Sequence, residues 1–171
     1  SDGSQVIIAV ANLFLAGYIL FYQIKKDKKS DNATARLNEQ NIKLQWFKEL
    51  VVQPNIEIIE LFYNNLHNIK DRINSTDLSE EEKLSINDFV KEESVKLRKS
   101  FIDVLLNIDK NFYNQVMQNI DKLVDSITDA IFNDKLKLYE PSVYDKYIGS
   151  NISYSRNNLI ALLYNYKGLP S

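Results

Sequence analysis

The sequence predicts an all-α membrane protein in which one N-terminal transmembrane helix precedes a helical bundle. Three observations support this fold class. Residues 6–24 form a long apolar run without a charged residue. Beyond it, apolar residues recur at helical spacings of three and four. No segment long enough for a β-strand shows alternating apolar and polar residues. Glycine and proline are scarce, with four and three residues in a chain of 171, which suits long helices.

Composition bounds the class of protein further. The chain has no cysteine, which excludes a disulfide framework and any thiolate nucleophile or metal site. Its formal net charge is −2, so overall charge does not indicate a nucleic-acid binder. The length predicts one domain with an anchor. We assign residues 1–29 to the anchor and residues 30–171 to a cytoplasmic helical domain.

The apolar run has the length of a membrane span, because a bilayer core of roughly 30 Å needs about 20 residues of helix. Four lysines follow it at once, and no lysine or arginine precedes it. They are Lys25, Lys26, Lys28 and Lys29, the basic collar. The positive-inside rule places the N-terminus outside and the C-terminal domain in the cytoplasm. A cleaved signal peptide would carry its charge before the run and a small-residue site after it.

One face of the predicted span carries small and polar residues. Ala9, Asn12 and Ala16 recur at spacings of three and four, and Gln23 falls one heptad later. Small residues let membrane helices approach closely, and Asn or Gln can hydrogen-bond across the contact. This assembly face predicts self-association of the span. Lining of an aqueous pore is the alternative function of the same face.

The cytoplasmic body is predicted to start with a helix over residues 33–52, which Pro54 ends or restarts. Its apolar side comprises Leu37, Leu44, Phe47 and Val51. The next helix carries a continuous apolar stripe. That stripe comprises Ile59, Phe62, Leu66, Ile69 and Ile73. Ser79 and Glu82 have the spacing of a capping box and predict the start of a third helix.

The third helix and its successor are joined at residues 109–111, which allow either a break or a continuation. The inward residues of the third helix are Val90, Leu97, Phe101, Leu105 and Ile108. Those of the following helix are Tyr113, Val116, Ile120, Leu123, Ile127 and Ile131. Residues 138–151 are expected to form a loop with a short helical turn. Ser153 or Ser155 would then cap a last helix, with Gly168 and Pro170 at its end. The whole body is a bundle of four or five long helices.

Catalytic and cofactor motifs are missing from the sequence. There is no Gly-rich phosphate loop and no H-E-x-x-H pair. His67 is the single histidine and lies beside the apolar stripe of its helix, which favours a structural or surface position. Acidic pairs such as Glu92 and Glu93 fit a solvated helix face. We predict no metal and no cofactor.

One short motif indicates a family. Arg156 and Asn157 are expected at the start of the last helix, and this pair resembles the first half of the R-x4-6-H motif of HEPN ribonucleases, which are helical bundles. The resemblance requires a histidine at residue 161, 162 or 163, but Ala161, Leu162 and Leu163 stand there. Alanine cannot transfer a proton, so the chain is not expected to be an enzyme. Ala161 is either a natural loss or an engineered change. The structural alternative for Arg156 is a helix-end arginine that pairs with a carboxylate or carbonyl.

The whole layout resembles the small membrane-anchored HEPN-like accessory protein of type VI-B CRISPR systems. The shared features are the size, the N-terminal span with lysines after it, the helical body and the late Arg-Asn. The resemblance implies antiviral defence at the bacterial inner membrane, a ring-shaped homo-oligomer or pore, and the RNA-guided ribonuclease of the system as functional partner.

Three functions remain open on the sequence alone. The first is a self-assembling protein that permeabilises or depolarises the membrane, in which the basic collar would favour anions. The second is a membrane-tethered ribonuclease, which needs His67 close to Arg156 and would bind RNA. The third is a non-catalytic scaffold that recruits a partner, with the lysines holding anionic lipid at about 1 kcal/mol each.

Overall fold

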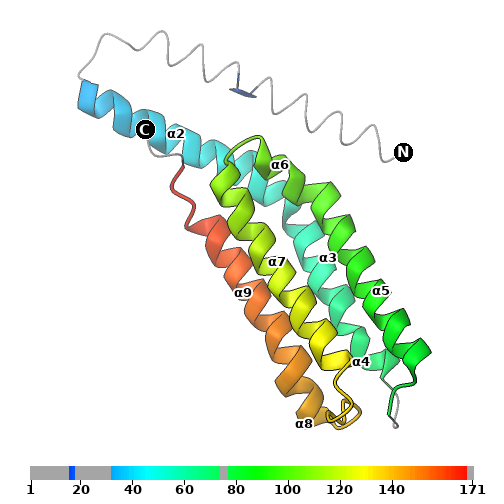
Figure 1. Cartoon of the computed structure of the whole chain (residues 1–171). Helices are drawn as coiled ribbons and strands as arrows, with labels where there is room; N and C mark the ends of the chain where they lie inside the picture. The colour runs from blue at the N-terminus through cyan, green and yellow to red at the C-terminus, as the bar shows by residue number, and fades with distance from the viewer. Residues whose placement is uncertain (1–15, 18–31, 74–76, 169–171) are drawn as a thin grey trace. The chain divides into compact units, whose positions relative to one another are not determined.

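The computed structural model describes residues 16–17, 32–73 and 77–168 (Figure 1). These residues fold into helices and contain no strand, which confirms the all-α class. The predicted span and the basic collar lie outside the described residues, except for Ala16 and Gly17, which are helical. Among the described residues, no helix combines the length and the apolarity needed to cross a bilayer.

The chain divides into two compact units, of which the first comprises residues 1–55 and 166–171. Its described part starts with α2 (Asn32–Trp46), which continues into a π-helical turn, η1 (Phe47–Val52), and a 3₁₀ turn, η2 (Gln53–Asn55). The predicted first helix is therefore confirmed. Phe47 and Val51 are buried as predicted, with the Phe47 ring 4.4 Å from the Tyr166 ring between centroids. Leu37, however, is 62% exposed.

The second unit, residues 56–165, is a bundle of four long helical segments. The first joins α3 (Ile56–His67) and α4 (Ile69–Arg72). The second joins α5 (Glu80–Leu97), η3 (Arg98–Ile102) and α6 (Asp103–Leu106). The third is α7 (Lys110–Ile131). The fourth joins α8 (Pro141–Tyr144), η4 (Asp145–Gly149) and α9 (Ser150–Tyr164).

Short connections make successive segments antiparallel, as in an up-and-down bundle. Within this unit α5 packs against α3 and α7, and α9 packs against α7 and α3. The four segments lie side by side in Figure 1, with α7 between α5 and α9. Because every segment contacts two others, each apolar stripe is covered from both sides.

The predicted stripes form the core of this bundle. Ile59, Phe62, Leu66 and Ile69 are buried, and so are five of the six residues predicted on α7. Tyr113 is the exception: it is half-buried, and its neighbour Phe112 takes the inward position. Full burial of a Leu, Ile or Phe side chain contributes about 1.5–3 kcal/mol, so these stripes account for the assembly of the bundle.

Two helix starts are fixed by side chains that accept backbone hydrogen bonds. The Ser79 hydroxyl accepts from the Glu82 N–H at 3.3 Å, and the Glu82 carboxylate accepts from the Ser79 N–H at 2.8 Å. The predicted capping box is therefore confirmed. At the next start, Asp109 Oδ1 accepts from the N–H groups of Asn111 and Phe112. Asp109 is thus the N-cap of α7, and the chain breaks there rather than continuing as one helix.

The prediction for the C-terminal third was wrong in one respect. Residues 138–151 are not a loop, because a helical segment starts at Pro141 and runs to Tyr164. Proline at the first helical position suits a helix start, since its missing N–H has no partner there. Ser153 and Ser155 consequently lie inside α9 and cap nothing. The helix ends at Tyr164, before Gly168, and Pro170 lies outside the described residues.

The stripe of this last segment is easy to overlook. Its buried residues recur at spacings of four, four, three, four and four. They are Tyr144, Ile148, Ile152, Ser155, Leu159 and Leu163. A tyrosine and a serine occupy two of these inward positions. The aliphatic residues alone therefore place the start of the helix too late in the sequence.

Candidate functional site

Arg156 is held by a carboxylate from a neighbouring helix of the bundle. Its Nε donates to Glu60 Oε2 at 2.9 Å, and its Nη2 donates to Glu60 Oε1 at 2.6 Å. This is a bidentate arginine–carboxylate pair, whose two parallel hydrogen bonds fix the relative orientation of the two groups. The hydrogen bonds that Arg156 donates to Glu60 raise the pKa of the guanidinium. The side chains are 39% and 32% exposed, so the pair lies at the edge of the core and not within it.

The predicted motif does not converge on one point. Arg156 lies in the middle of α9 and not at a helix start, which corrects the expected position. Asn157 and Ala161 are exposed. Residues five apart on an α-helix are rotated by about 140° around its axis. A side chain at position 161 therefore points away from the guanidinium that Glu60 holds.

His67 is not a partner of Arg156 in the described part of the chain. It is exposed at the end of α3, seven residues after Glu60. At a rise of 1.5 Å per residue, seven residues separate the two positions by about 10 Å along the helix. The guanidinium bonds to Glu60, and no hydrogen bond or ion pair joins it to the imidazole.

A buried polar layer adjoins the Arg156–Glu60 pair and joins three helices. It comprises Tyr63 of α3, Asn119 of α7, and Ser155 and Asn158 of α9. The Tyr63 and Ser155 hydroxyl oxygens are 3.0 Å apart. Asn119 Nδ2 donates to the Ser155 carbonyl at 3.0 Å and to its hydroxyl at 3.1 Å, and Asn119 Oδ1 accepts from Asn158 Nδ2 at 2.9 Å.

Burial governs the chemistry of this layer. Tyr63, Ser155 and Asn119 are 0%, 3% and 7% exposed. Burial raises the pKa of Tyr63 to about 12, so its phenol stays neutral at physiological pH. Ser155 bonds to an amide and a phenol and lacks the adjacent base that an activated serine needs. The layer can therefore organise the bundle but offers no nucleophile.

Sequence reasoning missed this layer, although one signal was present. Asn119 falls three residues after Val116 and four before Leu123, so a polar residue occupies an inward position of the α7 stripe. Ser155 was considered only as a cap. Buried polar side chains are nearly always hydrogen-bonded, so an inward asparagine predicts a polar partner on a facing helix.

Three residues of the polar layer, Asn119, Ser155 and Asn158, also line a groove between α7 and α9. The groove has a volume of about 510 Å³ and is rich in amide side chains. Its amides are Gln115, Gln118, Asn119, Asn151 and Asn158. An amide both donates and accepts hydrogen bonds, so this surface suits polar contacts. Across the described ranges, no group of His, Asp and Glu side chains could hold a metal ion.

The described fold and site define an all-α bundle with a buried polar layer and one charge pair at its edge. Comparison with protein-family models, curated proteins and solved structures found no match. Of the other residues predicted to be functional, Ala16 is helical. Those that lie outside the described residues are Ala9, Asn12, Gln23, Lys25, Lys26, Lys28 and Lys29.

Proposed function

We propose that this chain is a membrane-anchored, self-assembling accessory protein of antiviral defence that permeabilises or depolarises the bacterial inner membrane. The anchor rests on the uncharged run of residues 6–24 with the basic collar after it. Self-assembly rests on the assembly face, and defence rests on the resemblance to the type VI-B accessory proteins. The RNA-guided ribonuclease of such a system is the proposed functional partner, and the helical domain is its cytoplasmic part.

The helical domain is proposed to be non-catalytic, and one observation carries this part. Nε and Nη2 of the Arg156 guanidinium both donate hydrogen bonds to Glu60, so the motif arginine makes a structural contact. Ala161 supplies no proton donor or acceptor, and its helical position is turned away from Arg156 by about 140°. This geometry argues against the ribonuclease alternative.

The mass of the detergent-solubilised full chain tests self-assembly. We expect light scattering to give one large, discrete oligomer. Asn12→Leu should lower the mass, because it removes the polar group of the assembly face. Phe14→Leu, two residues away and on a different side of the span, is the matched control and should leave the mass unchanged. A monomeric parent would refute the pore and favour the recruiting scaffold.

Conductance across a planar bilayer tests permeabilisation. A ring of collars would place many lysines at one mouth, and such charged rings favour the opposite ion. We expect anions to permeate better than cations. Replacing the four collar lysines by glutamine should abolish the preference without abolishing conductance. Equal permeability in the parent would remove the collar from the mechanism.

Cleavage of single-stranded RNA tests the ribonuclease alternative. We expect no cleavage by the parent or by Ala161→His, because the new imidazole would not face Arg156. If Ala161→His cleaves RNA and the added Arg156→Ala change abolishes that cleavage, the two positions do converge. The helical domain would then be a degenerate ribonuclease.

A further inference from the structure

A second, smaller pocket lies at the end of the bundle where two connections meet. It is lined by Ile73, Asp77 and Leu78, by Lys83 of α5, and by the end of α7 with the chain after it, and its volume is about 180 Å³. Its aliphatic lining comprises Ile73, Leu78, Ile131, Leu136 and Leu138. An apolar cavity of about 150 Å³ in another protein accepts benzene. This pocket therefore has room for a six-membered ring or a short alkyl chain.

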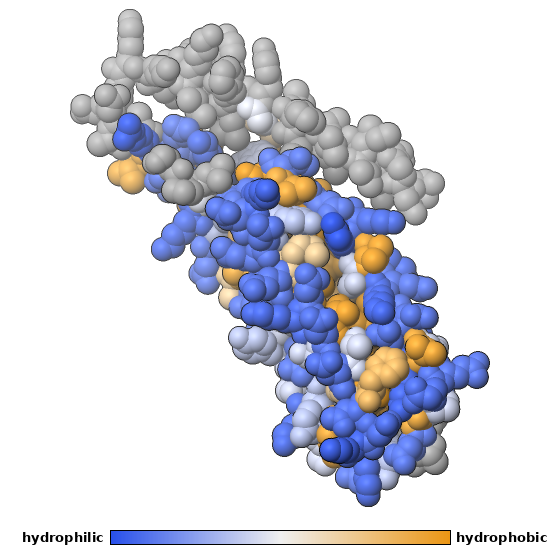
Figure 2. Space-filling model, viewed as in Figure 1, coloured by the Kyte–Doolittle hydropathy of each residue, from blue (hydrophilic) through white to orange (hydrophobic). Residues whose placement is uncertain are grey.

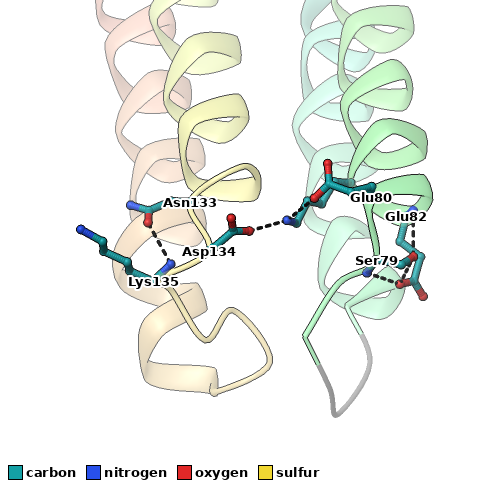
Figure 3. A network of polar contacts seen from close by, with 7 residues as sticks. Ser79, Glu80, Glu82, Asn133, Asp134 and Lys135 are labelled. Atoms are coloured by element: carbon teal, nitrogen blue, oxygen red, sulfur yellow. Dashed lines mark hydrogen bonds and ion pairs between the residues drawn. The ribbon is translucent and has the colours of Figure 1, made fainter.

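The basic residue that lines the pocket is Lys83, whose side chain is only 9% exposed. Its Nζ donates to Glu80 at 2.7 Å and to Asp134 at 2.5 Å. In Figure 3, Asp134 extends from the connection after α7 toward the start of α5, while Lys135 of the same connection points the other way. The hydrogen bonds to Asp134 and Glu80 raise the pKa of Lys83, so the ammonium stays charged and doubly paired.

The rim of the pocket is consequently acidic. The carboxylates of Asp77 and Asp134 line it, and Asp134 also accepts a hydrogen bond from the Lys83 ammonium. An anion that entered would meet two carboxylates and one ammonium that is already paired. A cation would meet an excess of one negative charge at this rim, beside the aliphatic lining.

We propose that this pocket binds a small amphipathic amine, with its apolar part on the aliphatic floor and its ammonium at the carboxylates of Asp77 and Asp134. Tyr139 also lines the pocket, and a tyrosine ring attracts an ammonium that lies over its face. The cavity and its aliphatic walls set the size and apolar character of the ligand. The rim sets the sign of its charge.

Three ring compounds of matched size separate these contributions. They are benzylammonium, benzyl alcohol and benzoate, each titrated into the full chain in detergent with isotope-labelled isoleucine methyl groups. The methyl signals of Ile73 and Ile131 report the pocket directly, so partition of a probe into detergent does not mimic binding. We expect a saturable shift with benzylammonium, and binding at least ten-fold weaker with benzoate. Benzyl alcohol should fall between them.

Two variants with matched controls locate the site. Asp77→Asn should weaken benzylammonium binding at least three-fold. Glu57→Gln removes the same charge at the far end of α3 and should change nothing. Leu136→Trp should fill the pocket and abolish the shift, whereas Leu106→Trp, at an exposed position outside the lining, should not.

Several results would overturn the proposal. These are no saturable shift with benzylammonium, benzoate binding as tightly as benzylammonium, and a shift that persists in a folded Leu136→Trp protein. Methyl spectra of each variant without ligand verify that it is folded.

Discussion

Removing the Ser155 hydroxyl should destabilise the bundle more than any exposed serine would. Ser155 is 3% exposed, and its hydroxyl contacts two buried partners, the Tyr63 phenol at 3.0 Å and the Asn119 amide at 3.1 Å. Asn119 keeps its bond to the Ser155 carbonyl after Ser155→Ala, but the Tyr63 phenol loses the Ser155 hydroxyl and keeps only its contact with the Asn119 amide. A buried donor or acceptor left unsatisfied costs about 1–3 kcal/mol. We therefore expect a loss of about 2 kcal/mol in the free energy of unfolding, measured by urea denaturation.

A double-mutant cycle distinguishes this cause from a general packing defect. Tyr63→Phe alone leaves the Ser155 hydroxyl without its phenol, whereas the double variant removes both groups and can be nearly neutral. We expect the double variant to lose at least about 1 kcal/mol less than the sum of the single losses. Ser126→Ala, whose hydroxyl bonds only to the Lys122 carbonyl of its own helix, is the control. Additive losses, or a loss at Ser155 no larger than at Ser126, would refute the reasoning.

Three further predictions concern the charge pairs and the last helix. Arg156→Ala should cost only about 1 kcal/mol or less in urea unfolding, because the pair with Glu60 is about one-third exposed. Burial would raise the pKa of Glu93, but hydrogen bonds from Lys96 and Asn65 outweigh burial and lower the pKa below its ordinary value of 4.5. Ionised Glu93 therefore stabilises the fold above that pH. This contribution is lost as the pH falls through the lower pKa of the folded state. Glu93→Gln should then flatten the acid loss of stability in a pH series of urea midpoints. Gly149→Ala should raise the free energy of unfolding by about 0.5–1 kcal/mol, because alanine favours a helix over glycine. The position is helical with φ −57°, and an added Cβ would meet Asp145 Oδ1 at 3.5 Å, an ordinary contact.

The sequence predicted most of this fold because aliphatic stripes and caps are local signals. Burial of Ile59, Leu66 or Ile127 follows from spacing alone, since residues three and four apart share a helix face. The capping box at Ser79 was predicted for the same reason, because both partners lie within one turn. These signals need no knowledge of which helices are neighbours.

The start of the last helical segment could not be predicted from the spacing of apolar residues. Pro141 is compatible with a loop and with a first helical turn, and Gly149 has a low helix propensity. Tertiary burial decides between them, because Tyr144 and Ile148 become 3% and 0% exposed only when the segment is helical and packed. Because residues 138–151 were expected to form a loop, the last helix was expected to start near Arg156. An arginine in the middle of α9 therefore resembled the arginine of a helix-start motif.

The partner of Arg156 could not be predicted either, since Glu60 is 96 residues away in sequence. Once α3 and α9 are paired, the contacts follow from helix phase. Glu60 and Tyr63 are three apart on α3, and Ser155 and Arg156 are adjacent on α9, so the charge pair and the phenol–hydroxyl contact meet at the same level of the bundle.

This alignment fixes the register of α3 against α9. Sliding α3 past α9 by one turn would displace the partners by about 5.4 Å, which is too far for any of these hydrogen bonds. Aliphatic stripes that repeat every three or four residues discriminate poorly against such a slip, because one leucine or isoleucine replaces another. The polar layer and the Arg156–Glu60 pair do discriminate, since a slipped register would leave buried polar groups without partners. We therefore expect variants without these groups to lose the uniqueness of the packed bundle before they lose its helix content.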